Sequence, residues 1–199
     1  YIHQCCRPQM SLQDQLILKE GRHPLIDEKK VVANTVILKD HRMLLISGSN
    51  TGGKTVTLKM TGLLSFMALC GMAIPCLEAT IPLFDQIYVD LGDEQSIEQS
   101  LSTFSSHMMK IIDILKSATR HSLVILDEIG SGTDPQEGAS LAEAILSRFI
   151  EMGPFVLAST HYGKLKTFAK EHPEILMASV SFDLEAMRPT YQLKLDSVG

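Results

Sequence analysis

The chain has 199 residues, of which 45% are hydrophobic and 21% charged, and its formal net charge is −5. This length suits one domain of ordinary size, and a composition without low-complexity tracts or internal repeats is that of a globular protein. The acidic balance and the lack of a long basic cluster exclude an ordinary nucleic-acid footprint. We therefore expect any DNA or RNA contact to come mainly from elsewhere.

The sequence also bounds the compartment. Its four cysteines form no C-x-x-C pair, so they predict neither a zinc site nor a redox pair. The most apolar stretch, residues 62–74, is too short to span a bilayer, and the N-terminus has no signal peptide. We expect a cytoplasmic protein with no membrane partner. Because the chain opens at Tyr1 and stops after a strand-like stretch, we interpret it as a piece of a longer protein.

Strands and helices are expected to alternate along the chain. Residues 1–20 form a polar, helix-compatible lead-in, and Pro24 favours a turn over residues 20–26. Hydrophobic patterning then predicts the remaining elements in chain order: strands at 31–38 and 43–47, a helix at 56–73, an extended piece between Pro75 and Pro82, a strand at 86–90, an acidic loop at 92–99, a helix at 103–119, a strand at 123–126, a helix at 138–150, a strand at 155–159, a helix at 164–169, and strands at 178–182 and 190–195.

This alternation predicts an α/β fold with a mostly parallel sheet flanked by helices. In such a sheet, ligands bind beyond the carboxyl ends of the strands. Polar residues should therefore gather at those ends, and three groups of them do.

The first group is the glycine-rich stretch "GSNTGGKT" at residues 48–55, between an apolar strand and a helix. It fits G-x-x-x-x-G-K-[ST], in which backbone N–H groups and the helix N-terminus bind phosphates. Lys54 would reach the β- and γ-phosphates of a nucleotide, and the Thr55 hydroxyl would bind Mg²⁺. The alternative, an ordinary glycine turn, is disfavoured because both the strand and the helix are in place.

The second group is Asp127-Glu128, directly after the apolar strand "SLVIL". In a P-loop enzyme the Asp holds Mg²⁺, and Glu128 is well placed to activate the attacking water. A solvated acidic turn is the alternative, and the glycine-rich stretch upstream argues against it.

The third group is "STH" at residues 159–161, where His161 could sense a γ-phosphate or serve a structural role; we favour the functional one. Two further stretches stay open. "GSGTDP" at 130–135 is either a plain connection or a loop that crosses to a second subunit. In "LSTFSSH" at 101–107, Ser102 or Thr103 could cap a helix, or the helix N-terminus could meet a phosphate across a dimer interface.

The motifs "GRHP", "GSNTGGKT", "LSTFSSH", "LVILDEIGSGTDP" and "STHY" follow one another in this order. Together they resemble the ATPase domain of the MutS family, which belongs to the ABC-type P-loop ATPases. The resemblance covers about residues 20–195. It implies a P-loop NTPase fold with ATP and Mg²⁺ as cofactors.

Details of these motifs are similar to one branch of the family. Mismatch-repair MutS proteins usually carry "GPNMGGKS", "STFMVE" and "DEIGRGTST", whereas Ser49, Thr51 and Thr55 depart from the first motif and His107 replaces a Glu. "GDEQSIEQSLSTFS" and "GTDPQEGA" resemble the MutS-two branch, which is linked to suppression of recombination and to an Smr nuclease domain. A nuclease activity would lie outside this chain.

The resemblance also implies roles by position. Glu128, His161 and Lys54 would be catalytic, and Thr55 and Asp127 would hold the metal. Ser102 and Asp134 would act at a dimer interface, and Gln95 would couple the nucleotide to the rest of the protein. The nucleotide would be bound by Gly48, Ser49, Asn50, Thr51, Gly52, Gly53, Lys54, Thr55, Val56 and Val32.

By this resemblance, residues 1–20 lead in from a missing upstream domain, and residues 21–199 form the ATPase domain without its C-terminal dimerisation helices. ATP binding and hydrolysis would close and open a homodimer and so control binding of branched DNA, or of stalled ribosomes, through regions outside this chain. The rival hypotheses are a mismatch-repair MutS ATPase domain, a small-molecule P-loop kinase and a non-catalytic nucleotide-dependent scaffold.

Overall fold

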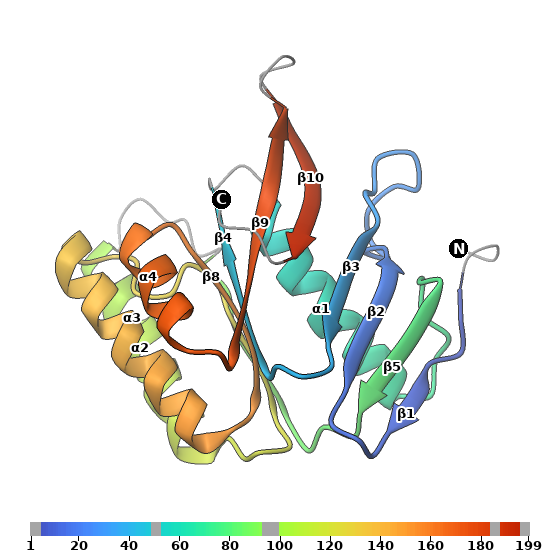
Figure 1. Cartoon of the computed structure of the whole chain (residues 1–199), viewed down its shortest axis with the longest axis horizontal. Helices are drawn as coiled ribbons and strands as arrows, with labels where there is room; N and C mark the ends of the chain where they lie inside the picture. The colour runs from blue at the N-terminus through green and yellow to red at the C-terminus, as the bar shows by residue number, and fades with distance from the viewer. Residues whose placement is uncertain (1–4, 49–52, 93–99, 184–187, 196–199) are drawn as a thin grey trace.

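The computed structural model describes residues 5–48, 53–92, 100–183 and 188–195. Its larger sheet has six strands in the order β10-β9-β4-β8-β7-β6, and every neighbouring pair is parallel except β10 with β9 (Figure 1). The strands are β4 (Met43–Ser47), β6 (Ile87–Asp90), β7 (Leu123–Leu126), β8 (Phe155–Thr160), β9 (Ile175–Asp183) and β10 (Arg188–Leu195).

A second sheet of four strands has the order β1-β5-β2-β3. Here β2 pairs antiparallel with both β3 and β5, whereas β1 runs parallel to β5. The strands are β1 (Gln9–Ser11), β2 (Leu16–Gly21), β3 (Asn34–Leu38) and β5 (Glu78–Pro82). The turn between β3 and β4 carries the chain from this sheet into the six-stranded one.

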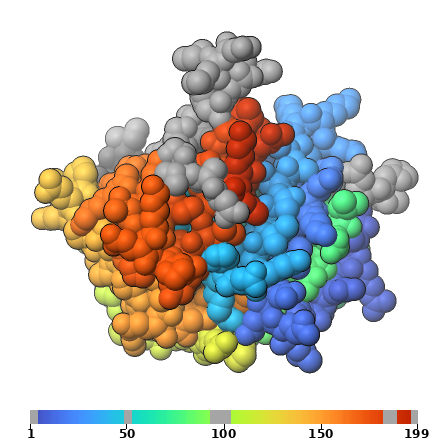
Figure 2. Space-filling model, in the orientation of Figure 1, coloured from blue at the N-terminus to red at the C-terminus, as the bar shows by residue number. Residues whose placement is uncertain are grey.

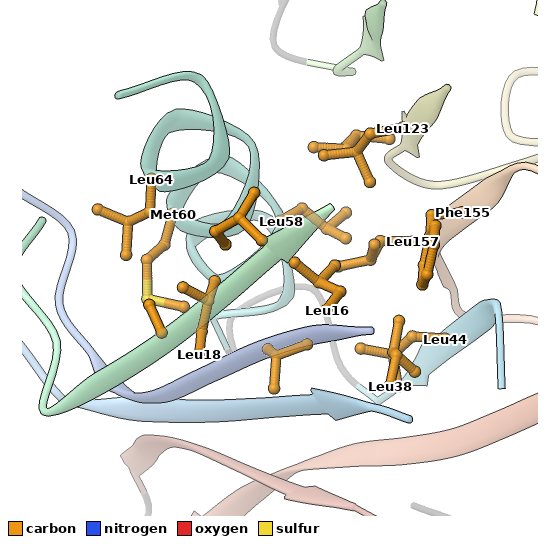
Figure 3. Packing of buried hydrophobic residues seen from close by; sticks show 14 of the residues in the cluster. Leu16, Leu18, Leu38, Leu44, Leu58, Met60, Leu64, Leu123, Phe155 and Leu157 are labelled. Atoms are coloured by element: carbon orange, nitrogen blue, oxygen red, sulfur yellow. The ribbon is translucent and has the colours of Figure 1, made fainter. Parts of the chain in front are cut away.

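The helices divide between the two faces of the six-stranded sheet. They are α1 (Lys54–Leu69), α2 (Ser100–Ser117), α3 (Pro135–Met152) and α4 (Gly163–Glu171). Alternate strand residues point to opposite faces, so Leu44 packs with α1 and the smaller sheet, whereas Leu45 packs with α2, α3 and α4. Figure 3 shows the first of these cores, in which Leu58 of α1 lies near Leu16 of β2 and Leu157 of β8. The observed fold confirms the predicted mostly parallel sheet flanked by helices.

Strands 43–47 and 123–126 begin and end where the sequence predicted. The helical lead-in over residues 1–20 was wrong, because residues 9–11 and 16–21 are strands, and β2 runs past residue 20. The polar flanks suggested a helix, but Leu16, Ile17 and Leu18 are all buried, as in a strand covered on both faces. An upstream domain stays a prediction.

Two helix starts also needed correction. α1 begins at Lys54, two residues before the expected start, and ends at Leu69, before Gly71 with its positive φ of 76°. α2 begins at Ser100, so the helix-cap role that we considered for Ser102 or Thr103 was wrong: both lie inside the first turn. None of the described helices is long and apolar enough to cross a membrane.

Candidate functional site at the carboxyl edge of the six-stranded sheet

Four parallel strands of the large sheet end in polar residues at one edge. Gly48 follows β4, Asp90 closes β6, Asp127 follows β7, and His161 follows β8. The strand register aligns these ends, because Ser47 pairs with Thr160 and Asp90 pairs with Leu126. The sequence prediction that polar groups gather at the carboxyl ends is confirmed for Asp127 and His161, and Asp90 is an addition that the sequence analysis did not name.

Two glycines of the glycine-rich stretch, Gly48 and Gly53, have backbone conformations that favour glycine. Gly48 has φ 137° and Gly53 has φ 92°, which L side chains rarely adopt. A Cβ on Gly53 would also lie 2.8 Å from Cδ1 of Tyr191, too close for any real contact. Gly53 therefore starts α1 in a conformation and a space that suit glycine alone. The predicted phosphate-binding residues Ser49, Asn50, Thr51 and Gly52 lie outside the described residues.

Lys54 is the first residue of α1 and is only 1% exposed. Its Nζ donates hydrogen bonds to the main-chain oxygens of Gly48, at 2.6 Å, and Thr160, at 3.4 Å. Burial lowers the pKa of Lys54 below its ordinary value, although the charges of Glu128 and Asp127 raise it. The first turn of α1 holds no acidic residue, so the positive end of the helix dipole adds to the Lys54 charge. An anion bound here would gain from both.

A chain of hydrogen bonds connects the start of α1 to the ends of β7 and β8. The Thr55 hydroxyl donates to Oδ2 of Asp127 at 2.5 Å, and the buried Ser159 hydroxyl donates to Oδ1 of the same carboxylate. Ser159 Oγ in turn accepts the backbone N–H of Glu128 at 2.8 Å. Both Asp127 oxygens are thus held in place, and the Glu128 backbone is fixed by the same serine. Sequence reasoning gave no role to Ser159, although it stands in the "STH" motif.

Glu128 has φ 49°, a left-handed conformation that is uncommon in residues other than glycine. Such a backbone costs on the order of 1–3 kcal/mol and persists only where the surroundings impose it. The Ser159 hydrogen bond on one side and Gly130, with φ 81°, on the other supply that constraint. The half-buried side chain of Glu128 is therefore directed by a fixed turn at the strand end.

Thr55 and Asp127 suit Mg²⁺ by the chemistry of their donors, a hydroxyl and a carboxylate whose oxygens lie 2.5 Å apart. Mg²⁺ binds oxygen and usually keeps several waters, with one or two carboxylates and substrate phosphates as its other ligands. Within the described part of the chain, no group of three or more His, Cys, Asp or Glu side chains could hold a metal by itself. A protein site of two oxygen donors fits a magnesium ion that arrives with a phosphate ligand.

An apolar hollow of about 320 Å³ lies beside the start of α1. Val32 and Val56, both predicted to contact nucleotide, line it together with Ile26, Val31 and Tyr191. Strands β3 and β10 meet here, since Asn34 Nδ2 donates to the Tyr191 oxygen at 3.0 Å and Asn34 Oδ1 accepts the Leu193 N–H at 2.7 Å. In Figure 2 the red atoms of the C-terminal strands lie beside the light-blue atoms of the segment that leads into β4. A flat ring of the size of a purine suits such a hollow.

Tyr191 is a residue that sequence reasoning missed. It stands in β10 with φ 60°, where the register with β9 shifts between Pro189 and Leu193. The predicted strand "TYQLKL" gave no sign of that shift, and the partner Asn34 lies 157 residues away. No local signal could have placed the ring beside Gly53.

The other predicted residues divide into placed and unplaced ones. His161 is exposed at the end of β8, with its ring 4.2 Å from that of Tyr162. Asp134 is exposed and is the N-cap of α3, where Oδ1 accepts the N–H groups of Gln136 and Glu137. Ser102 lies in the first turn of α2. Gln95 lies outside the described residues, so its coupling role stays a prediction.

Two arrangements near the site came from the structure alone. Asp90 accepts a hydrogen bond from His107 of α2. The buried Tyr162 hydroxyl donates to the Gly130 oxygen at 2.9 Å, and burial raises the pKa of Tyr162. Gly130 and Gly138 approach so closely that a Cβ on Gly138 would lie 2.3 Å from the Gly130 oxygen. The loop behind Glu128 is therefore packed tightly onto α3.

Comparison with known proteins gives a consistent picture. Residues 44–198 match the family model described as MutS domain V. The chain is 49% identical over 203 residues to "Endonuclease MutS2" of Levilactobacillus brevis, covering 100% of the chain and 26% of that protein. It is 50% identical over 197 residues to "Endonuclease MutS2" of Clostridium tetani, covering 98% of the chain and 25% of that protein.

The chain thus spans about a quarter of the length of these relatives. The matched region runs from β4 through β10 and includes the glycine-rich segment, Asp127, Glu128 and His161. By this match, which covers most of its length, the chain belongs to the MutS domain V family.

Proposed function

We propose that this chain is a P-loop ATPase domain of the ABC type, which binds Mg·ATP at the carboxyl edge of the six-stranded sheet and hydrolyses it. The observation that carries the proposal is the contact of Thr55, next to the buried Lys54, with Asp127. This contact places the Lys54 cation, which can bind phosphate, close to two oxygen donors for Mg²⁺, those of Thr55 and Asp127. The carboxylate of Glu128 belongs to the residue after Asp127. Membership of the MutS domain V family supports the same reading.

Each residue has a distinct role in this proposal. The backbone of residues 48–55 binds the phosphates, and Lys54 neutralises charge on the β- and γ-phosphates. Thr55 and Asp127 hold Mg²⁺, which supplies charge neutralisation for phosphoryl transfer when bound. Glu128 takes a proton from the attacking water, and His161 donates a hydrogen bond to the γ-phosphate. The adenine ring occupies the hollow lined by Val32, Val56 and Tyr191.

Desolvation of Lys54 gives a physical reason for the affinity. Burial lowers the pKa of Lys54, and a phosphate at the N-terminus of α1 would add a further opposite charge that favours the ammonium form. Asp127 and Glu128 would repel the same phosphate if no cation stood between them. ATP binding should therefore depend strongly on Mg²⁺.

We further propose that two copies share their sites, with Ser102 of one subunit approaching the γ-phosphate held by the other and Asp134 lying in the loop that crosses the interface. Closure and opening of this homodimer would control binding of branched DNA, or of stalled ribosomes, through regions outside this chain. The names of the relatives support the MutS-two branch over mismatch-repair MutS.

The test is a phosphate-release assay with ATP and Mg²⁺ and no second substrate, run beside a titration with a labelled ATP analogue. The proposal expects free phosphate from the wild-type protein, and none above background without Mg²⁺. Transfer of the phosphoryl group to an added small molecule would favour a P-loop kinase instead. Binding without any turnover would leave a nucleotide-dependent scaffold, and no binding at all would overturn the proposal.

A further inference from the structure

A half-buried histidine and a buried carboxylate form a pair at the rim of the candidate site. His107 Nδ1 lies 2.9 Å from both Oδ1 and Oδ2 of Asp90, and their side chains are 16% and 4% exposed. A carboxylate can only accept, so Nδ1 carries the proton of this hydrogen bond. Lys110 Nζ lies farther away, at 3.9 Å from Asp90 Oδ1, and is 47% exposed, so solvent screens it. His107 is thus the main described partner of a nearly buried charge.

The pair joins two parts of the molecule that the site needs. His107 lies on α2, seven positions from Ser100, where the helix begins. Asp90 ends β6, and its main-chain oxygen accepts the N–H of Asp127 at 2.8 Å. A continuous path therefore runs from α2 through His107 and Asp90 to the backbone of the candidate metal ligand.

The pair also borders a small recess, together with the two acidic residues of the candidate site. Asp90, His107, Asp127 and Glu128 all line it, and its volume of about 10 Å³ leaves room for about one water at most. The recess is therefore closely packed. A shift of α2 relative to β6 would be passed to the turn that holds Glu128 rather than absorbed by an empty space.

From this geometry we propose that the His107–Asp90 pair positions α2 against the turn that carries Asp127 and Glu128. The inference rests on the proposed ATPase function and adds a residue pair to it. His107 and Asp90 are positioning residues and need not touch nucleotide. The pair keeps a fixed distance between the groups that serve the subunit's own nucleotide and the start of α2, which carries Ser102 toward the partner's nucleotide.

Three variants of the full-length protein separate positioning from simple folding. His107→Asn keeps an amide N–H close to the place of Nδ1, so it should preserve the link. His107→Phe keeps a ring but removes the donor, and it leaves the Asp90 charge buried without its main described partner, which threatens the fold. The double variant Asp90→Leu/His107→Phe removes both polar groups, and such replacements are often neutral for stability. Lys110→Met is the matched control for charge near Asp90.

The readouts are kcat and KM for ATP, thermal unfolding, and hydrogen exchange of α2 amides against those of α1. We expect the double variant to unfold close to the wild-type temperature, with kcat lowered roughly 10-fold or more, the range for outer-shell partners. KM should change by less than about threefold, because Lys54 and the glycine-rich segment are intact. Exchange should rise in α2 and not in α1. His107→Asn and Lys110→Met should keep kcat within about threefold of wild type.

Several results would overturn the inference. A double variant that keeps wild-type kcat and α2 protection would show that the pair positions nothing. A parallel loss of kcat and unfolding temperature in every His107 variant, with no rescue by asparagine, would assign the pair to stability alone. If the wild-type protein neither binds nor hydrolyses ATP, the proposed function itself fails and takes this inference with it. These outcomes are distinguished by the wild-type assay run first.

Discussion

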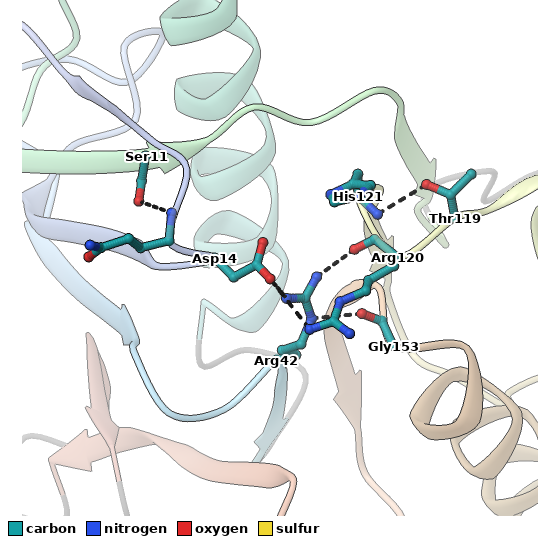
Figure 4. Close-up of polar contacts among 8 residues, drawn as sticks. Ser11, Asp14, Arg42, Thr119, Arg120, His121 and Gly153 are labelled. Atoms are coloured by element: carbon teal, nitrogen blue, oxygen red, sulfur yellow. Dashed lines mark hydrogen bonds and ion pairs between the residues drawn. The ribbon is translucent and has the colours of Figure 1, made fainter.

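The two ends of the six-stranded sheet both hold a network of charged side chains, but only one end is arranged to bind a ligand. At the amino end, Arg42 precedes β4 and donates from Nε to the Gly153 oxygen at 2.7 Å and from Nη2 to the Arg120 oxygen at 2.5 Å. Its Nη1 lies 2.7 Å from Asp14 (Figure 4), and its guanidinium lies over the Phe155 ring at 4.4 Å. All three guanidinium nitrogens have partners within the chain. The cluster therefore links segments that precede several strands.

At the carboxyl end the charges are placed differently. Lys54 is buried with a lowered pKa, and the Asp127 carboxylate, adjacent to Glu128, accepts hydrogen bonds from the hydroxyls of Thr55 and Ser159. Each end of the sheet contains a residue with a positive φ, Asp14 at 51° and Glu128 at 49°. Backbone strain therefore does not distinguish the carboxyl end from the amino end. The difference is electrostatic. At the amino end, Arg42 is paired with groups of the chain itself. At the carboxyl end, a bound anion and a divalent cation would stabilise the charged groups.

The largest expected effect separates chemistry from binding at the carboxyl end. Glu128→Gln keeps the shape of the side chain and removes the proposed base, so turnover should fall by roughly 10²-fold or more while ATP is retained. Stopped-flow or endpoint phosphate assays with a parallel ATP titration would measure both. Glu171→Gln, at the exposed end of α4, is the matched control. Wild-type turnover in Glu128→Gln would remove this residue from its role.

The second prediction tests whether a single chain holds every residue of a working nucleotide site. Mixing Ser102→Ala subunits with Lys54→Ala subunits should restore about one working site per mixed dimer, because one site then pairs an intact lysine with an intact serine. The measurement is ATPase rate against mixing ratio, with dimer formation checked by sedimentation. If mixed dimers form and stay inactive, Ser102 does not act across the interface.

A third variant disturbs the carboxyl end through packing. In Gly138→Ala the new Cβ would meet the Gly130 oxygen at 2.3 Å and the Tyr162 hydroxyl at 2.7 Å. We expect a stability loss of about 1–3 kcal/mol, typical of overpacking, together with lower turnover as the Glu128 turn shifts. Gly163→Ala, also in the first turn of a helix, meets no atom within 4 Å and should be nearly neutral. Equal effects in denaturant unfolding would contradict the account.

The smallest effect is expected in the apolar hollow. Tyr191→Ala removes the ring beside Gly53 and should weaken ATP binding by roughly 5- to 30-fold, the effect of about 1–2 kcal/mol for one aromatic stacking contact. Tyr191→Phe, which keeps the ring, should bind within about twofold of wild type. Titration of labelled ATP compares the two variants. An unchanged affinity in Tyr191→Ala would show that the adenine ring does not stack on Tyr191.

The features that the sequence predicted correctly depend on residues close together in the chain. The strands at 43–47 and 123–126, and the polar groups at their carboxyl ends, follow from apolar runs that stop at Gly48 and Asp127. The contacts it missed join residues far apart in the chain, such as Tyr191 with Asn34, or α2 with β6 through His107 and Asp90. The early strands β1 and β2 were missed because their pairing partners, β5 and β3, come later in the chain.

The most direct test compares one variant from each end of the sheet. Lys54→Met removes the buried cation, and Arg42→Lys keeps the charge but loses the planar fork that joins three partners. Both proteins are examined by ATP titration in Mg²⁺ and by denaturant unfolding. We predict that Lys54→Met lowers ATP affinity by at least about 10-fold in a protein that still folds, because the cation that neutralises the phosphates is removed.

Arg42→Lys should instead lose about 1–3 kcal/mol of unfolding free energy and bind ATP with wild-type affinity. This pattern would establish the carboxyl end as the ligand site and the amino end as scaffold. The reverse pattern, with intact ATP affinity in Lys54→Met or lost affinity in a folded Arg42→Lys protein, would contradict the account.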